Sequence, residues 1–317
     1  MHVLIDCDPG HDDMLAILLA AKHLDLVAVT TVHGNQSVER TTDNALKVLE
    51  LAGLQHIPVS RGLAKPLVGE AVHAPEVHGE SGLDGVELPA PSISAVEADA
   101  VHTIIELSKR HDDLVLVPTG PLTNVAAALT VDPGMAGRIR QISLMGGSLT
   151  FGNSTPAAEF NIWVDPEAAD IVFRSGVPIR MFGLNVTRLA SATAERIERI
   201  RRQGNPVATT VADLLEFYRA SLERVFGLPG ASLHDPLAAA TLIRPDLFEL
   251  REMHVGVELH GTRTRGMTVC DYRHANTAPL QGKDAVRRGE PPNAEVAVGI
   301  DVDGFFDLLT ETLGSYV

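Results

Sequence analysis

The sequence is short of cysteine, and this shortage narrows the class of protein. Two cysteines in 317 residues, Cys7 and Cys270, cannot form the disulfide framework of a small secreted domain. Carboxylates flank Cys7 and would raise its pKa, so we do not expect it to be a nucleophile, and we expect Cys270 to pack in a strand. Cysteine usage therefore favours a reducing compartment such as the cytoplasm.

Basic charge and long hydrophobic runs are also scarce. There are 26 Lys and Arg residues against 41 Asp and Glu, and the formal net charge of -15 argues against a broad contact with nucleic acid phosphates. Apolar runs such as residues 14–21 are too short to span a bilayer. No basic leader followed by a long apolar region is visible, so we expect no secretory signal. These features predict a soluble cytoplasmic protein with a neutral ligand or a bound cation.

What the chain does contain is an alternation of strand-like and helix-like segments. Short apolar segments predict buried strands at residues 2–7, 25–33, 114–118, 139–145 and 178–182. Helical patterns are interspersed with them at residues 12–23, 37–51 and 95–110. Such alternation implies right-handed crossovers. We predict an α/β fold with a single open, mainly parallel, Rossmann-like sheet, helices on both faces, and one domain over residues 1–317.

Two stretches interrupt this alternation. Residues 61–94 are rich in Gly, Pro and His and have little apolar periodicity, and a long irregular segment in a compact domain is often functional. Residues 193–226 form a charged helical region interrupted at residues 204–206, whose charge is typical of a solvated face. Neither stretch marks a linker between domains.

The strongest chemical signal is a cluster of four acids, Asp6, Asp8, Asp12 and Asp13, directly after the first predicted strand. Ligands of an open parallel sheet bind beyond the carboxyl ends of the strands, which is where these acids lie. Four carboxylates this close repel one another unless a cation neutralises them, and oxygen ligands favour Ca²⁺ or Mg²⁺ over Zn²⁺. Capping of the following helix by Asp12 would explain one acid, not four.

Other polar clusters follow other predicted strands, at residues 33–35, 118–124, 145–147 and 158–161, and a further one lies at residues 234–236. Taken alone, Asn35 or Asn153 would be a turn residue. Asp235 alone would be a helix N-cap, with Pro236 at the first helical position. Because these clusters share one edge of the predicted sheet, we expect them to line a common site.

The chain resembles the inosine-uridine preferring nucleoside hydrolases. The resemblance rests on Asp-Cys-Asp-Pro-Gly-His-Asp-Asp at residues 6–13, followed in order by Pro-Thr-Gly-Pro-Leu-Thr-Asn, Ala-Glu-Phe-Asn and His-Asp-Pro, and it covers essentially the whole chain. It implies calcium-dependent hydrolysis of the N-glycosidic bond of ribonucleosides to ribose and free base. It also implies a homotetramer or homodimer, and the reaction suggests a role in nucleoside salvage.

The resemblance also implies roles for individual residues. The Ca²⁺ ligands would be the carboxylates of Asp8, Asp13 and Asp235 and the backbone carbonyl of Thr119. The ribose hydroxyls would be held by Asp12, Asn35, Glu159 and Asn161, with Asn153 as a further sugar contact. The base would lie near His78 and His234.

A mechanism follows from these roles. Asp8 would take a proton from a metal-bound water, and the carboxylates and carbonyl oxygens would favour an oxocarbenium-like transition state. His234 is the candidate donor to the leaving base because histidine titrates near neutral pH, although it could instead only order the loop before the next helix. His78 could equally be a surface histidine.

The segment at residues 214–226 also carries two interpretations. In the family such a helix lies near the base. Its pattern equally predicts an amphipathic core helix with four side chains inward: Leu214, Leu215, Tyr218 and Leu222. The two interpretations are compatible.

Base preference and rival functions stay open at this point. Trp163 follows Asn161 rather than lying in the loops around the base, which favours a broad inosine/uridine or a pyrimidine preference over purine stacking. A phosphatase of the haloacid dehalogenase type also has Asp-x-Asp after its first strand, but it leaves Glu159 and Asn161 unexplained. A non-catalytic nucleoside or ribose sensor would keep the metal and ribose contacts without the chemistry.

Overall fold

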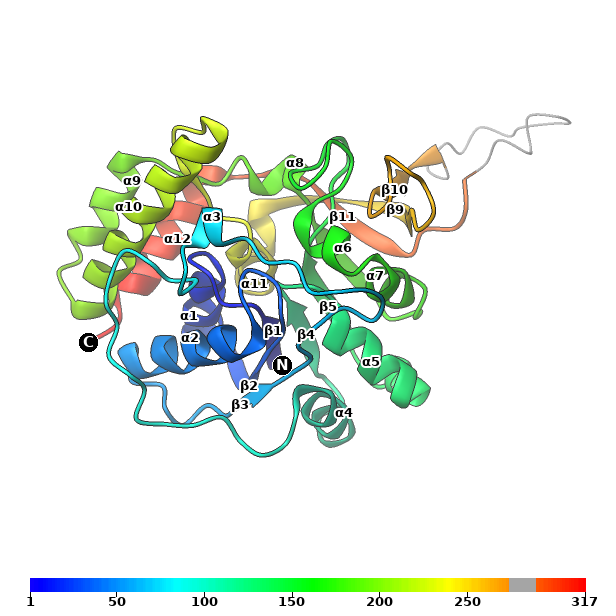
Figure 1. The fold of residues 1–317 in the computed structure, drawn as a ribbon, viewed down its shortest axis with the longest axis horizontal. Coiled ribbons are helices and arrows are strands. Elements are labelled where there is room, and N and C mark those ends of the chain that lie inside the picture. Colours follow the sequence, from blue (N-terminus) through cyan, green and yellow to red (C-terminus); the bar gives the residue numbers. More distant parts are fainter. Residues whose placement is uncertain (274–288) are drawn as a thin grey trace, which may run out of the picture.

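The computed structural model describes residues 1–273 and 289–317, and these residues form a central sheet with helices on both faces (Figure 1). The strands of this sheet are β1 (His2–Cys7), β2 (Asp25–Thr31), β3 (Val59–Arg61), β4 (Val115–Pro118), β5 (Gln141–Met145), β6 (Ile179–Phe182), β9 (Phe248–Val257), β10 (Thr268–Asp271) and β11 (Ala294–Ile300). Their order is β10-β9-β11-β6-β5-β4-β1-β2-β3. Strands β7 (Ser191–Ala192) and β8 (Ala231–Ser232) form a separate antiparallel pair.

The sheet is open and mainly parallel, as predicted. From β3 through β11 every neighbouring pair is parallel, and β9 and β10 extend the β11 edge in antiparallel fashion. All five predicted strands are present, although β2 ends at Thr31 rather than at residue 33. Cys270 lies in β10, as expected.

Two groups of helices cover the two faces of the sheet. On one face, α1 (Asp13–His23), α2 (Val38–Leu51) and α11 (Pro236–Ile243) lie against the strands, and α9 (Ala194–Arg201), α10 (Pro206–Phe226) and α12 (Val302–Gly314) extend the same core by packing on one another and on α1. The other packs against α4 (Ala100–Arg110), α5 (Thr123–Val131), α6 (Phe160–Val164) and α7 (Pro166–Phe173). Alternate residues of β1 show the division: Val3 and Ile5 join the first core and Leu4 joins the second.

The predicted helices are present with shifted ends. Helix α4 begins at Ala100, later than expected, because the Asp99 carboxylate caps it by accepting a hydrogen bond from the His102 amide. The charged region at residues 193–226 divides into α9 and α10, and Asn205 caps the second helix. The irregular stretch at residues 61–94 contains only the short helix α3 (Pro75–His78). In the described part of the chain, no helix is long and apolar enough to cross a membrane.

Asn124, in the first turn of α5, ties the irregular stretch to the sheet. Its fully buried side chain donates from Nδ2 to Asp6 Oδ1 (2.8 Å) and to the Thr31 carbonyl (2.9 Å). Its Oδ1 accepts from the Leu63 amide at 2.9 Å. One amide side chain therefore joins β1, β2 and the segment after β3.

We predict that Asn124→Ala lowers the free energy of unfolding by about 2–4 kcal/mol, because the Leu63 amide and the Thr31 carbonyl lose a buried partner. Urea denaturation followed by circular dichroism measures the change. Val131→Ala at the end of the same helix is the control: its side chain is 70% exposed, and the change should be within about 0.5 kcal/mol. Equal midpoints for Asn124→Ala and the unchanged protein would contradict the structural role.

Candidate active site

A cavity of about 350 Å³ lies at the carboxyl ends of the parallel strands. Residues that follow successive strands line it, such as Asp8 after β1, Asn35 after β2 and Thr119 after β4. The predicted site residues that line it are Asp8, Asp12, Asn35, His78, Thr119, Asn153, Glu159, Asn161, His234 and Asp235. Asp13 is absent from the lining because it is fully buried beside it, bonded to Thr119 and Asn35. The structure therefore brings all the predicted site residues together.

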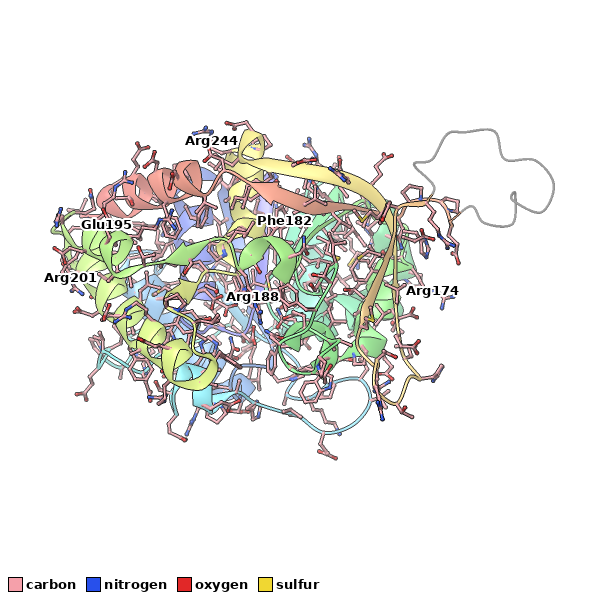
Figure 2. The ribbon with its side chains drawn as sticks, turned by 90° about the horizontal axis from the view of Figure 1, so that it is seen from above. Arg174, Phe182, Arg188, Glu195, Arg201 and Arg244 are labelled. Carbon is pink, nitrogen blue, oxygen red and sulfur yellow. The ribbon has the colours of Figure 1, made fainter. Side chains whose placement is uncertain are left out.

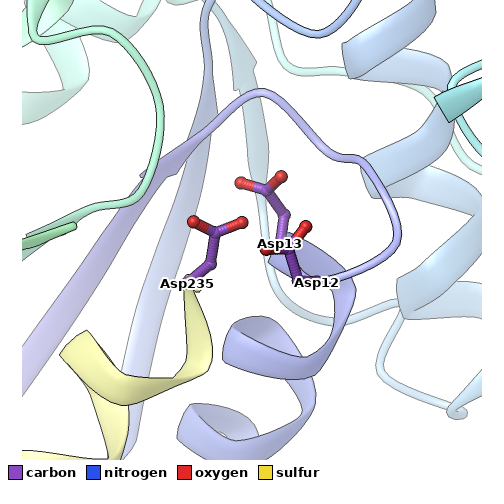
Figure 3. A group of neighbouring side chains, drawn as sticks. All are labelled: Asp12, Asp13 and Asp235. Atoms are coloured by element: carbon purple, nitrogen blue, oxygen red, sulfur yellow. The ribbon is translucent and has the colours of Figure 1, made fainter. Parts of the chain in front are cut away.

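Three carboxylates, those of Asp12, Asp13 and Asp235, converge at this site (Figure 3). One oxygen of each lies within 4.8 Å of the others. Asp12 and Asp235 occupy the N-cap positions of α1 and α11, yet neither side chain caps its own helix. Asp12 Oδ2 instead accepts a hydrogen bond from the His234 amide at 3.0 Å. Both acids therefore hold the N-cap positions expected from the sequence, with Pro236 at the start of α11, but neither carboxylate makes the capping hydrogen bond.

Asp8 lies next to this group and is held by the turns that follow β2 and β4. The Asn35 amide donates to Asp8 Oδ2 at 2.7 Å, and Asn35 Nδ2 donates to the Asp8 carbonyl at 3.0 Å. A Cβ atom on Gly120 would lie 2.5 Å from Asp8 Oδ1, so only glycine lets the backbone after β4 approach this carboxylate. Asp13 is equally constrained, accepting from the Gly10 amide (3.0 Å) and Thr119 Oγ1 (2.8 Å).

The four acids Asp8, Asp12, Asp13 and Asp235 form one electrostatic unit. Burial raises the pKa of each, and repulsion from neighbouring carboxylates raises the pKa of Asp8, Asp12 and Asp235 further, that of Asp12 to about 7. In residues 1–273 and 289–317, no Lys or Arg forms an ion pair with any of them. Buried carboxylates without a cationic partner, beside a peptide carbonyl, form the oxygen donor set of a hard divalent cation, so the residues fit a metal ion.

Burial raises the pKa of Cys7 well above its usual value, and the charges of Asp13, Asp6, Asp8 and Asp235 raise it further. The thiol of Cys7 therefore stays protonated at neutral pH. This agrees with the expectation that Cys7 is not a nucleophile.

Glu159, Asn161 and Asn153 come from the segment after β5, and each holds that segment together while lining the cavity. Glu159 caps α6, accepting from the amides of Gly147, Asn161 and Ile162, and burial raises its pKa to about 7. Asn161 Nδ2 donates to the Thr119 carbonyl at 2.7 Å, and Asn153 Oδ1 accepts from the Phe160 amide at 2.9 Å. Asn161 Oδ1 and Asn153 Nδ2 make no hydrogen bond to the described residues and are available to a ligand.

His234 differs from the sequence expectation in its protonation. Burial, and next the charge of Arg188, lower its pKa to about 3, so that the imidazole is neutral at physiological pH rather than titrating there. Its Nδ1 lies 2.7 Å from Thr187 Oγ1. If the hydroxyl donates this bond, the proton of the neutral ring is on Nε2. His234 can then donate a hydrogen bond but is a poor source of a free proton.

Three further interpretations of the sequence can be compared with the structure. His78 is 6% exposed, so it is not a surface histidine. Tyr218 and Leu222 of α10 are buried in the core as the inward pattern predicted, and they also line the cavity. Trp163 lines the cavity as well, although its position in the sequence had placed it away from the base.

Arg188 is a site residue that the sequence analysis missed. It follows the short helix α8 (Leu184–Thr187) and lies near the centre of the molecule when this is viewed from above (Figure 2). Its guanidinium lies 4.5 Å from the centre of the Phe151 ring and lines the cavity. No motif contained Arg188; the only available signal was its position shortly after the predicted strand at residues 178–182.

Known proteins are similar to this chain over nearly its whole length. Pyrimidine-specific ribonucleoside hydrolase RihA of Shewanella oneidensis is 48% identical to this chain over 318 residues, covering 99% of this chain and 96% of the relative. The protein of the same name from Citrobacter koseri is 47% identical, covering 99% of this chain and 98% of the relative.

Solved structures share the fold over nearly the full length of both chains. A purine-preferring ribonucleoside hydrolase from Gardnerella vaginalis has a TM-score of 0.90 and 34% identity, covering 99% of this chain and 98% of that one. A plant nucleoside hydrolase has a TM-score of 0.91 and 33% identity, covering 99% of each chain. The sequence model of the inosine-uridine preferring nucleoside hydrolases matches residues 3–307. The chain therefore belongs to the inosine-uridine preferring nucleoside hydrolase family.

Proposed function

We propose that this protein is a calcium-dependent ribonucleoside hydrolase that prefers pyrimidine nucleosides and releases ribose and free base. The observation that carries the proposal is a group of buried, unpaired carboxylates facing a cavity large enough for a nucleoside. The relatives near 48% identity are named pyrimidine-specific, whereas the purine-preferring structure is 34% identical. The greater similarity to the first group supports the pyrimidine preference.

The cation proposed for this site is Ca²⁺. The side chains of Asp8, Asp13 and Asp235 and the carbonyl of Thr119 would hold it, and these are all hard oxygen donors. When bound, the ion would lower the pKa of a water molecule and anchor the ribose hydroxyls. The positive charge would also relieve the repulsion among the carboxylates, which keeps Asp8 ionised and able to accept a proton.

In this proposal the side chains of the cavity have different roles in the reaction. Asp8 accepts the proton of the attacking water. Asp12, Asn35, Asn153, Glu159 and Asn161 orient the ribose through its hydroxyls. As the bond to the base breaks, positive charge develops on the ribose ring, and the surrounding carboxylate and amide oxygens stabilise it more than they stabilise the neutral substrate. His234 donates a hydrogen bond from Nε2 to the leaving base.

The proposal also includes the location, the metabolic role and the assembly of the enzyme. We place it in the cytoplasm, in nucleoside salvage, as a homo-oligomer whose subunit is one domain over residues 1–317. Membership of the hydrolase family leaves the phosphatase alternative without support. A nucleoside or ribose sensor is the remaining alternative, and turnover distinguishes it.

The first test measures ribose released from uridine, cytidine, inosine and adenosine, with and without a calcium chelator. We expect faster release from the two pyrimidine nucleosides, loss of release with the chelator, and recovery when Ca²⁺ is added back. Faster release from the purine nucleosides would overturn the base preference. Calcium binding without release from any of the four would instead indicate a sensor.

Asp8→Ala should lower kcat/KM for uridine by at least about 10³-fold and weaken calcium binding, because one carboxylate serves both roles. Steady-state kinetics and titration calorimetry measure the two effects. Asp112→Ala, at an exposed aspartate, is the matched control and should change neither. A near-normal rate in Asp8→Ala would refute the assigned role.

His234→Ala should lower kcat for uridine by about 10²-fold or more, while p-nitrophenyl riboside loses less than about tenfold. The nitrophenolate is stable as an anion and leaves without help, whereas uracil needs a donor. His102→Ala, at an exposed histidine, serves as the control. Equal losses on both substrates would mean that His234 only holds the loop or the ribose.

A further inference from the structure

One charged side chain of the cavity, the guanidinium of Arg188, has no role in the proposed mechanism. Among the described residues that line the cavity, Arg188 is the only Lys or Arg. The same lining contains several carboxylates: Asp8, Asp12, Glu76, Glu159 and Asp235. Yet within residues 1–273 and 289–317 the guanidinium forms no ion pair and donates no hydrogen bond. Its charge and its N–H groups are therefore available to a ligand.

The backbone that carries Arg188 is firmly anchored. Helix α8 follows β6, and the Leu184 amide at its start donates to the Gly147 carbonyl at 2.9 Å. At its end, Thr187 Oγ1 lies 2.7 Å from His234 Nδ1. The residue after Thr187 is therefore held between the segment that follows β5 and the loop that carries His234.

The side chain of Arg188 is oriented by stacking. Its guanidinium carbon lies 4.5 Å from the centre of the Phe151 ring. Stacking uses the face of the planar guanidinium and leaves the N–H groups on its edge free to donate. Arg188 is half-buried, and this burial lowers its pKa, but a guanidinium stays charged at any physiological pH. The cavity therefore contains a permanent cation in a fixed place.

The position of Phe151 relates this cation to the substrate. Phe151 belongs to the same loop as Asn153, which lines the cavity and is one of the proposed sugar contacts. The guanidinium therefore lies beside the end of the cavity where the ribose and its bond to the base are expected. Thr187 and His234, the second of which is proposed to contact the base, lie on its other side.

Breaking the glycosidic bond places negative charge on the base. The bond from ribose C1′ to the base nitrogen breaks and its electron pair stays on the base. The water oxygen bonds to C1′, and its proton passes to Asp8. A pyrimidine joined through N1 spreads its new charge onto O2, the carbonyl oxygen next to that nitrogen, and solvent protonates the anion after release. Uracil and cytosine share this oxygen, whereas a purine joined through N9 has no oxygen beside the glycosidic nitrogen.

We propose that Arg188 is a catalytic residue whose guanidinium donates to O2 and stabilises the departing pyrimidine as an anion. The proposal rests on the proposed nucleoside hydrolysis and adds a group that acts on uridine and cytidine alike. A fixed cation attracts the departing anion more strongly than the neutral substrate, which is the condition for lowering the barrier.

The first test needs no turnover. 5-Nitrouracil ionises at a ring nitrogen near neutral pH, and its absorption spectrum changes when it does. With Ca²⁺ and ribose present, we expect its pKa to be lower by about 1 or more in the unchanged protein than in Arg188→Met, which keeps a side chain of similar length without the charge. Equal ionisation of the base in the two proteins would overturn the proposal.

The second test changes the acidity of the leaving base. Arg188→Met should lower kcat/KM for uridine by about 10²-fold, and the loss for 5-fluorouridine should be about fivefold smaller, because the more acidic fluorinated base needs less help to leave as an anion. Arg188→Lys, which keeps the charge, should retain at least about a tenth of the uridine activity. The control is Arg174→Met at an exposed arginine near one end of the molecule (Figure 2), which should change neither value. Equal losses on both nucleosides would show that Arg188 only supports the cavity.

The third test identifies the oxygen atom. Sulfur is a weaker hydrogen-bond acceptor than oxygen and makes the base more acidic at either position, so 4-thiouridine is a matched control for 2-thiouridine. We expect the unchanged protein to prefer 4-thiouridine by about tenfold and Arg188→Met to lose most of this preference. No preference in the unchanged protein, or the same preference in both proteins, would refute the contact with O2.

The three tests separate failure of this proposal from failure of the proposed function. Hydrolysis of uridine that is unaffected by Arg188→Met would refute the catalytic role and leave the proposed function intact. Absence of hydrolysis by the unchanged protein would refute the proposed function, and the ionisation of bound 5-nitrouracil would still decide whether Arg188 stabilises a base anion.

Discussion

Four carboxylates share one buried corner of this molecule, and their mutual repulsion is the constraint on which the rest of the site depends. Burying a single unpaired charge is costly, and burying four together is more so. The fold lowers this cost with its own dipoles: α1 and α11 begin at the cluster, and their N-termini contribute partial positive charge. Amides and hydroxyls from the neighbouring turns then hold Asp8 and Asp13. We expect the remaining imbalance of charge to favour binding of a cation at this site.

Much of this arrangement could be predicted from the sequence, because the signals were local. The strand at residues 2–7 is apolar, and Asp8, Asp12 and Asp13 follow it directly, so the rule that parallel strands end at one edge sufficed to gather them. The same rule placed Asn35 and Thr119. Asp235 was harder, since it follows no predicted strand, and only the resemblance to a family connected it with the first loop.

Other features could not be predicted because they depend on tertiary contacts. The charges along β9 hide its alternation, so the antiparallel edge of the sheet was not anticipated. An aspartate before a helix can be either a helix cap or a ligand of the site, and the sequence alone does not distinguish the two. In the structure the Asp12 carboxylate accepts a hydrogen bond from the His234 amide rather than from its own helix. The low pKa of His234 arises from burial and from Arg188, which lies far from it in sequence. The hydrogen on His11 Nε2 likewise depends on the Asp84 carbonyl of the irregular stretch.

The hydrogen bond between Asp12 and the His234 amide joins residues separated by 222 positions. It has a consequence for biosynthesis. The acidic loop leaves the ribosome well before the segment that carries His234 and Asp235. Domains fold as units as the chain emerges. During that interval the loop has no partner at Asp12, and its acids stay hydrated and exposed. The acidic cluster is therefore completed only after the segment carrying Asp235 has been made, so products truncated before that segment lack this site.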